Sequence, residues 1–224
     1  SRVDGGENIN IKNDLEIPLI SEAALTGSYE IFNSLIKQGA KLKGADRLMR
    51  YAAMGGSSKI FKKLLDEGFK IDYIALDFAA KEGHLSIVKI FLESGIDVNH
   101  QEDIVVESLT KIETKSDTML SSAAHYRRWN DIEKINNKID TINYLLDNGA
   151  DINLHGKFGN TALHWAAGDE NIKIVELLLK KGAKIDYETQ KSYTALNQCC
   201  INGQCEVARI LLERGADPNR NNIF

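Results

Sequence analysis

The residues best suited to chemistry are three cysteines close together in the chain, Cys199, Cys200 and Cys205. Clustered thiols are typical of a nucleophilic centre or a metal site. An odd, clustered count argues against a disulfide framework. Cys199 and Cys200 also stand where other parts of the chain carry two alanines, and a free cysteine packs like a small apolar residue. We therefore expect a structural role for them.

The other candidates for catalysis or metal binding lack a suitable arrangement. Five histidines are scattered without the short spacing of a zinc site: His84, His100, His125, His155 and His164. Ser121 and Ser122 belong to no nucleophile-elbow motif, and the glycines form no phosphate-binding loop. We predict a protein that is not an enzyme, with no catalytic residue, no cofactor and no metal.

The overall charge is slightly acidic, with 28 Lys and Arg, 32 Asp and Glu, and a formal net charge of −4. Such a chain has no basic excess for nucleic acid or an anionic membrane. Its apolar runs are shorter than the roughly 20 residues of a membrane helix, and residues 1–10 lack the apolar stretch of a signal peptide. We expect a cytoplasmic monomer, or one in a host cytoplasm if the chain is a secreted effector.

The elements that would position these residues recur along the chain. A pair of small residues occurs six times, each followed by an apolar run and a glycine, and such a fixed period indicates a repeat architecture. The first residue of the pair lies 16 residues before the glycine in five repeats and 26 in the fourth. The pairs begin at Ala23, Ala52, Ala79, Ala123, Ala166 and Cys199, and the glycines are Gly39, Gly68, Gly95, Gly149, Gly182 and Gly215.

Each repeat is predicted to form two antiparallel helices. The small pair lets neighbouring helices approach closely, and the apolar residues of the second helix recur at helical spacing. Glycine follows that helix because it adopts the left-handed conformation without a side-chain clash. One repeat buries too little apolar surface to be stable alone, so six repeats would stack around a common core.

The fifth repeat, TALHWAA (161–167) followed by IVELLLKKGA, resembles the ankyrin-repeat family and its Thr-Pro-Leu-His-x-Ala signature. TAL (194–196) and TML (118–120) match in part; proline is replaced in all three, and the first three repeats lose most Thr and His positions. The resemblance implies an all-α solenoid of stacked helix-turn-helix units, with short β-hairpin fingers mainly in the C-terminal half. It also implies that His164 is a structural histidine that binds neighbouring loops.

The resemblance divides the chain into an N-terminal extension, 1–16, and an ankyrin-repeat domain, 17–224. The repeats are expected at about 17–44, 45–72, 73–99, 117–153, 158–186 and 191–219. Insertions are expected at about 100–116 and 129–138.

The insertion before the fourth repeat is acidic and partly apolar. Residues 100–117 carry five acidic residues and two lysines, a local charge of −3, together with Ile104, Val105 and Val106. Two outcomes are open: a short helix that folds back over the groove, or a segment that binds a partner.

The fourth repeat contains ten additional residues. Ile132, Ile135, Ile139 and Ile142 share one helical face. The second helix is therefore expected to start about two turns early, capped by Asn130 or Asp131, and to project from the stack.

Near its base are Tyr126, Arg127, Arg128 and Trp129, residue types that often anchor protein partners. Alternatively, Tyr126 and Trp129 seal the insertion against the acidic segment.

Regular fingers, the loops that join successive repeats, are expected at 154–160 and 187–193. Their tips are expected to expose a mixture of aromatic and charged residues, which suits a partly polar protein interface. These residues are His155, Lys157, Phe158, Tyr187, Lys191 and Tyr193. Alternatively the loops are merely solvated, with Phe158 and Tyr193 packed on the next finger.

The resemblance implies a module that binds a protein partner through its concave face and its fingers, and we expect the projection of the fourth repeat to contribute to the same interface. A second hypothesis makes the chain a targeting or scaffolding part of a larger enzyme or secreted effector, because the sixth repeat keeps an internal type of sequence.

A third hypothesis concerns Asn99, Asn153 and Asn219, which stand at the hairpin position that asparaginyl hydroxylases modify in this family. The structural alternative is that each asparagine stabilises its own turn.

Overall fold

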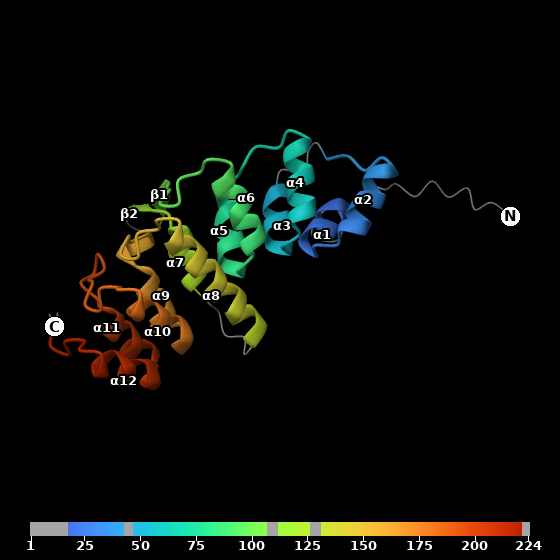
Figure 1. The fold of residues 1–224 in the computed structure, drawn as a ribbon. Helices are drawn as coiled ribbons and strands as arrows, with labels where there is room; N and C mark the ends of the chain where they lie inside the picture. Colours follow the sequence, from blue (N-terminus) through green and yellow to red (C-terminus); the bar gives the residue numbers. More distant parts are fainter. Residues whose placement is uncertain (1–17, 43–46, 107–111, 126–130, 221–224) are drawn as a thin grey trace. The chain divides into compact units, whose positions relative to one another are not determined.

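The computed structural model describes residues 18–42, 47–106, 112–125 and 131–220 (Figure 1). These residues form twelve α-helices, one short 3₁₀ helix and one pair of strands, and the predicted all-α ankyrin-repeat stack is confirmed. Two compact bodies are distinguished among these residues: an N-terminal body that extends to residue 79 and includes 86–91, and a C-terminal body that includes 80–85 and continues from residue 92. Among the described residues no helix combines the length and apolarity needed to cross a bilayer.

The helices occur in pairs along the chain. The elements are α1 (Leu19–Leu25), α2 (Tyr29–Lys37), α3 (Leu48–Gly55), α4 (Ser58–Asp66), α5 (Tyr73–Glu82), α6 (Leu85–Glu93), β1 (Asp103–Val106), β2 (Ile112–Lys115), α7 (Met119–Ala124), α8 (Ile132–Asp147), η1 (Lys157–Gly159), α9 (Ala162–Gly168), α10 (Ile172–Lys180), α11 (Ala195–Asn202) and α12 (Cys205–Glu213).

In the N-terminal body, the small pairs of α1 and α3 are buried and the two helices pack directly. A Cβ added to Gly55 would lie 2.1 Å from the carbonyl oxygen of Ala24, so only glycine permits this approach. The core also contains Phe61 and Phe91, whose ring centroids are 5.1 Å apart.

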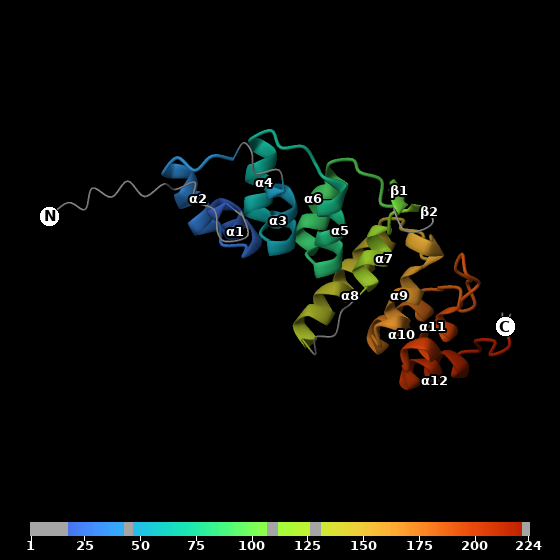
Figure 2. The ribbon, with the colours of Figure 1, turned by 180° about the vertical axis from the view of Figure 1, so that it is seen from behind.

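In the C-terminal body, the helices form two layers (Figures 1 and 2). The inner helices α7, α9 and α11 pack side by side, and α8, α10 and α12 each pack on the inner helix of their own repeat. The small pairs of α7 and α9 are fully buried between the layers, whereas in α11 Cys199 is buried and Cys200 is exposed.

The second helix of each repeat ends as predicted, at a glycine with positive φ. The six glycines named above have φ between 83° and 93°, and a Cβ at any of them would meet no atom within 4 Å. The left-handed backbone alone therefore selects glycine. After α8, for example, Gly149 N donates to Leu146 O and Ala150 N to Leu145 O, the bonding pattern of a Schellman motif.

The acidic insertion forms a β-hairpin, so the short helix, one of the two outcomes left open for it, is wrong. Strands β1 and β2 are antiparallel, in a register that aligns Asp103 with Lys115 and Val106 with Ile112. The β-branched run at 104–106 explains the difference, because such residues favour strands over helices. Residues 107–111 lie outside the described residues.

The long second helix of the fourth repeat is confirmed. α8 has 16 residues, whereas α10 and α12 have 9 each. Asp131 caps it as expected, since its Oδ1 accepts hydrogen bonds from Glu133 N at 3.0 Å and Lys134 N at 3.2 Å. Ile132, in the first turn, is 66% exposed.

The side chains of Asn99 and Asn153 do not bond their own turns, so the structural alternative given for them is wrong. The aspartate two residues earlier does so: Asp97 Oδ1 accepts from Asn99 N at 2.9 Å. Asn99 instead binds the following repeat, with Oδ1 accepting from Asp151 N at 2.8 Å and Nδ2 donating to Gly149 O at 3.0 Å. Asn153 Oδ1 likewise accepts from Lys184 N at 2.8 Å. These side chains are links between repeats.

Candidate protein-binding surface

Cys199 and Ser121 occupy structural positions, whereas Cys200 and Cys205 are exposed, so the expected packing of Cys200 as a small buried residue is wrong. Cys199 is fully buried, its Sγ lies 3.7 Å from Ala167 O, and burial raises the pKa of its thiol to about 12. A thiol that stays protonated is a poor nucleophile. Ser121 N donates to Thr118 Oγ1 at 3.0 Å, the N-cap bond of α7. No group of three His, Cys, Asp or Glu side chains within the described residues is placed to hold a metal ion.

His164 joins the start of α9 to the next finger, as the resemblance implied. Its Nδ1 lies 3.2 Å from Thr161 N and 2.8 Å from Thr161 Oγ1, and its Nε2 lies 3.1 Å from Tyr193 O. Because the Thr161 N–H can only donate, Nδ1 must accept and Nε2–H donates to Tyr193 O. Burial lowers the pKa of His164 to about 4, so the imidazole is neutral.

The finger at 154–160 is fixed by the segment before α7. Asp117 Oδ1 accepts a hydrogen bond from Lys157 N at 3.1 Å, and Gln101 Nε2 donates to His155 O at 2.9 Å. A Cβ added to Gly156 would lie 2.6 Å from the Cα of Asp117, so the two backbones are in close contact. The finger is closed by one backbone bond, from Gly156 N to Asn160 O at 2.8 Å, without paired strands.

The finger at 187–193 packs on the preceding finger. Gln190 N donates to Phe158 O at 3.2 Å, and a Cβ on Gly159, where φ is +81°, would lie 2.5 Å from Gln190 N. Thr189 N closes this finger by donating to Tyr193 O at 2.9 Å. In the part of the chain that the structure describes, strand pairing is confined to β1 and β2, so the C-terminal fingers are tight turns in place of the expected hairpins.

The structure brings the six predicted finger residues together on these two loops. We call His155, Lys157, Phe158, Tyr187, Lys191 and Tyr193 the finger surface. The centroid of the Tyr187 ring lies 6.1 Å from that of His155 and 6.3 Å from that of His164. Lys191 is exposed and Tyr193 is 41% exposed, whereas the other four residues are half-buried. Tyr126, Arg127, Arg128 and Trp129 lie outside the described residues.

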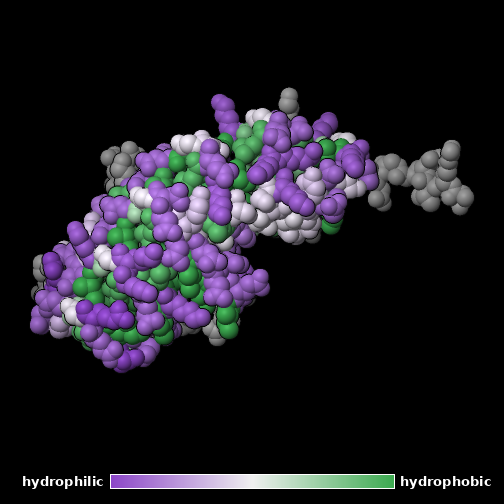
Figure 3. Space-filling view, in the orientation of Figure 1, coloured by the Kyte–Doolittle hydropathy of each residue, from purple (hydrophilic) through white to green (hydrophobic). Residues whose placement is uncertain are grey.

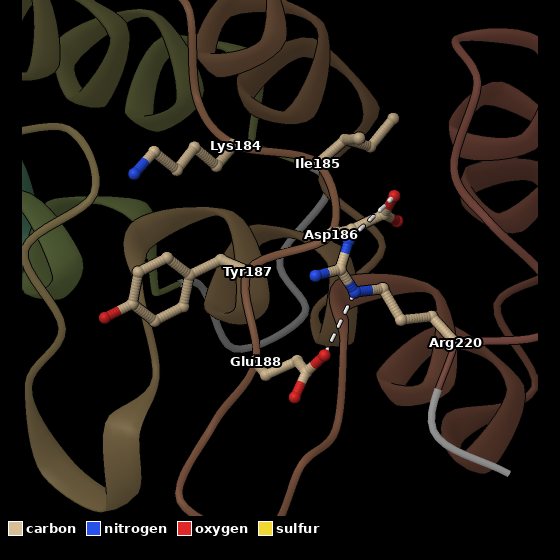
Figure 4. A pocket seen from close by; sticks show the side chains of 6 residues that line it. All are labelled: Lys184, Ile185, Asp186, Tyr187, Glu188 and Arg220. Carbon is tan, nitrogen blue, oxygen red and sulfur yellow. Dashed lines mark hydrogen bonds and ion pairs between the residues drawn. The ribbon is translucent and has the colours of Figure 1, made fainter.

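A hollow of about 540 Å³ lies at the base of the second finger (Figure 4). Arg220 forms one side, where its Nε donates to Glu188 Oε1 at 3.0 Å and its Nη1 lies 4.0 Å from Asp186 Oδ2. Tyr187 and Lys184 point away from this ion-pair network. The hollow therefore borders the finger surface at Tyr187, and its lining contains both acidic and basic side chains.

The inner helices contribute a polar and aromatic cluster that the sequence analysis missed. Trp165 Nε1 donates to Asp117 Oδ1 at 3.3 Å, and the Trp165 and His125 rings meet edge to face at 4.5 Å. His125 Nδ1 lies 2.9 Å from Asp169 Oδ2. These four side chains connect α7, α9 and the base of the first finger.

A signal for this cluster exists in the aligned repeats, at the position just before the small pair. Its residue type changes from repeat to repeat, although the pair itself does not. The six residues are Glu22, Tyr51, Phe78, Ser122, Trp165 and Gln198. All except Ser122 are half-buried. A residue type that varies between repeats, next to a small pair that does not vary, is typical of a side chain that faces a groove and does not pack in the core.

Comparisons with known proteins agree with this architecture. A family model described as ankyrin repeats (3 copies) matches residues 7–102 and 132–222. The crystal structure of the human ASB11 ankyrin repeat domain is similar, with 25% identity and a TM-score of 0.67 over 95% of this chain and 90% of that chain. No curated protein matches the sequence. The chain belongs to the ankyrin-repeat family, whose domains are typically non-catalytic and generally act as protein–protein interaction modules.

Proposed function

We propose that this chain is a non-catalytic module that binds a protein partner through the finger surface and the adjacent concave side of the inner helices. The observation that carries the proposal is the contrast between backbone and side chain at Tyr193. Its carbonyl oxygen accepts hydrogen bonds from His164 and Thr189, while the residue is 41% exposed. The backbone is held in place and the phenol ring is presented to solvent.

The other finger residues support the same reading. Lys191 is exposed and has neither an ion pair nor a side-chain hydrogen bond to another described residue. Lys157 Nζ lies 5.2 Å from the centroid of the Phe158 ring. Phe158 itself has φ of 59°, an uncommon conformation for a residue other than glycine. Preorganised loops that carry aromatic side chains lose little entropy on binding.

The proposed surface extends to the fourth repeat, where Tyr126, Arg127, Arg128 and Trp129 would provide a second set of anchors. The described residues on both sides of this segment are fixed by contacts with neighbouring side chains and backbone groups. His125 Nδ1 lies 2.9 Å from Asp169 Oδ2 and its ring lies against that of Trp165, and Asp131 caps α8. Arginine and aromatic residues are the types most enriched among energetically dominant interface residues.

Affinity capture from eukaryotic cell lysate tests the proposal. We would compare the natural chain with Lys191→Glu/Tyr193→Ser and with Arg127→Glu/Arg128→Glu/Trp129→Ala, after checking each fold by circular dichroism and thermal melting. Lys62→Glu, on an exposed position of α4, is the matched surface control. The proposal predicts that at least one protein is captured by the natural chain and the control but lost with one of the two variants. If both variants capture the same proteins as the natural chain, the proposal is contradicted.

A further inference from the structure

A second hollow of the C-terminal body, of about 500 Å³, lies on its outer helices. It contains no residue of the finger surface. We call its lining the outer groove: Ile139, Lys173, Glu176, Leu177, Lys180 and Arg214. The face of this body seen in Figure 3 is mixed, with apolar areas between hydrophilic side chains.

Helix α10 provides four of the six lining residues. Lys173, Glu176, Leu177 and Lys180 are three or four residues apart and therefore share one face of the helix. Arg214 follows α12, and Ile139 comes from the lengthened helix α8. The groove is thus formed by three outer helices.

Three cations in the outer groove have no acidic partner among the residues that the structure describes. Lys173, Lys180 and Arg214 are exposed, and none has an ion pair or a side-chain hydrogen bond to another described residue. Nearby cations differ: Lys181 Nζ lies 3.8 Å from Asp147 Oδ1, and Arg209 Nη2 lies 2.6 Å from Glu206 Oε1.

The charge of the outer groove is positive in a chain that is acidic overall. With Glu176, its three cations give a local charge of +2, against −4 for the whole sequence. A local patch of opposite sign to the rest of the molecule steers an acidic partner to that site.

Apolar side chains complete the lining. Leu177 and Ile139 are half-buried and both border the hollow. An aliphatic side chain placed against them would be removed from water, which is favourable in proportion to the apolar area covered.

From this arrangement we propose that the outer groove binds a short acidic segment of a protein partner, with an aliphatic residue between its carboxylates. The aliphatic residue lies against Ile139 and Leu177, and the carboxylates pair with Lys173, Lys180 and Arg214. Glu176 and the apolar lining make the groove unsuited to the uninterrupted phosphates of a nucleic acid. This site is additional to the finger surface and does not depend on it.

The probe is a fluorescein-labelled peptide, EDELLEDELLEE, whose binding to the whole chain is measured by fluorescence polarisation. Two control peptides separate the contributions: one replaces each leucine by serine, and one replaces each acidic residue by lysine. We expect saturable binding of the acidic leucine peptide, weaker binding of the serine peptide and none of the basic peptide. Binding should weaken as salt is raised, because exposed charges are screened.

Substitutions locate the site. Lys173→Glu/Lys180→Glu/Arg214→Glu should raise the Kd at least about tenfold, the effect of losing about 1.4 kcal/mol of binding free energy. Lys37→Glu/Lys62→Glu/Lys70→Glu, at three exposed positions of the N-terminal body, changes the net charge equally and should leave the Kd unchanged. Lys191→Glu/Tyr193→Ser should also leave it unchanged. All substituted cations are exposed, and circular dichroism confirms that each variant is folded.

Four results of the binding experiments would overturn the proposal, and a fifth comes from analytical ultracentrifugation. They are equal affinity for the groove variant and the natural chain, equal weakening by the charge-matched control, binding of the serine peptide as tight as that of the leucine peptide, and tighter binding of a single-stranded oligonucleotide than of the acidic peptide. Self-association in analytical ultracentrifugation that the groove variant abolishes would instead make a second copy of the chain the occupant, and would also overturn it.

Discussion

The carboxylate of Asp117 accepts a hydrogen bond from the indole Nε1 of Trp165 at 3.3 Å, through the same Oδ1 that accepts from Lys157 N at 3.1 Å. One side chain from the segment before α7 therefore fixes both the first finger and an aromatic residue of the inner helix α9. This bond couples the packing of the repeats to the geometry of the proposed binding surface.

The Asp117 link predicts a loss of stability on substitution. Asp117→Ala leaves two donors without their acceptor and should lower the free energy of unfolding by about 1–3 kcal/mol. Urea unfolding followed by circular dichroism measures it, with Asp140→Ala, at an exposed position of α8, as the control. An Asp117 variant as stable as the control would show that the two hydrogen bonds contribute nothing.

His164 predicts a pH dependence with a definite sign. Burial lowers its pKa from 6.5 to about 4, so the unfolded chain binds a proton more readily between these values. The stability contributed by neutral His164 is therefore fully present above pH 6.5 and is lost as the pH falls towards 4. A shift of this size corresponds to roughly 3 kcal/mol.

The matched variant for this prediction is His164→Asn. In the sixth repeat Asn197 occupies the same place and accepts from Thr194 N at 2.9 Å, so asparagine preserves the helix cap but not the bond to Tyr193. We expect the natural chain to be more stable at pH 7 and the difference to shrink as the pH approaches 4. A difference independent of pH, in parallel chemical denaturation series, would refute the neutral assignment.

Lys138 is a buried cation with an uncommon set of partners. Its Nζ donates to the carbonyl oxygens of Ala123 at 3.1 Å, His125 at 2.8 Å and Lys81. Burial is the main cause that lowers its pKa from 10.5 to about 8. The cost of burying the charge is fully present below pH 8 and is relieved as the pH rises from about 8 to 10.5.

The comparison of the natural chain with Lys138→Met tests this relation. Methionine leaves three carbonyl groups without a donor and should destabilise the protein by about 1–3 kcal/mol at pH 7. The deficit should grow between pH 8 and 10.5, because only the natural chain gains stability there. Lys134→Met, on an exposed position of the same helix, should show no such change, and a deficit that stays constant would contradict the prediction.

The hydrogen bonds from Asn99 to the following repeat predict that replacing this asparagine by alanine destabilises the protein more than the same replacement at Asn219. Asn99→Ala removes two hydrogen bonds to the next repeat and should cost about 1 kcal/mol of unfolding free energy. Asn219→Ala is the matched control, because Asn219 is exposed and its side chain binds no other described residue. Equal melting temperatures of the two variants would rule out the proposed link.

The repeat fold and the placement of the finger residues followed from the sequence because the period is set by local packing. Ala166 and Gly182 play the same parts in the fifth repeat as Ala23 and Gly39 do in the first. The features that were missed depend on contacts between repeats or on insertions, which no period describes. Asp117 reaches Trp165 across 48 positions, and Asn99 reaches Asp151 across 52, with the acidic hairpin between them. Within that hairpin, the β-branched run at 104–106 was a local signal for a strand, and the short-helix alternative did not take it into account.

Site-specific photocrosslinking tests the central claim most directly. A benzophenone amino acid would replace Tyr193, whose ring is exposed, and in a separate sample Lys62, which is exposed on α4. After irradiation in cell lysate, crosslinked proteins are identified by mass spectrometry. A protein-binding module that uses its fingers should form a defined covalent adduct from position 193 and none from position 62. The same adducts from both positions, or none from either, would contradict the proposed surface.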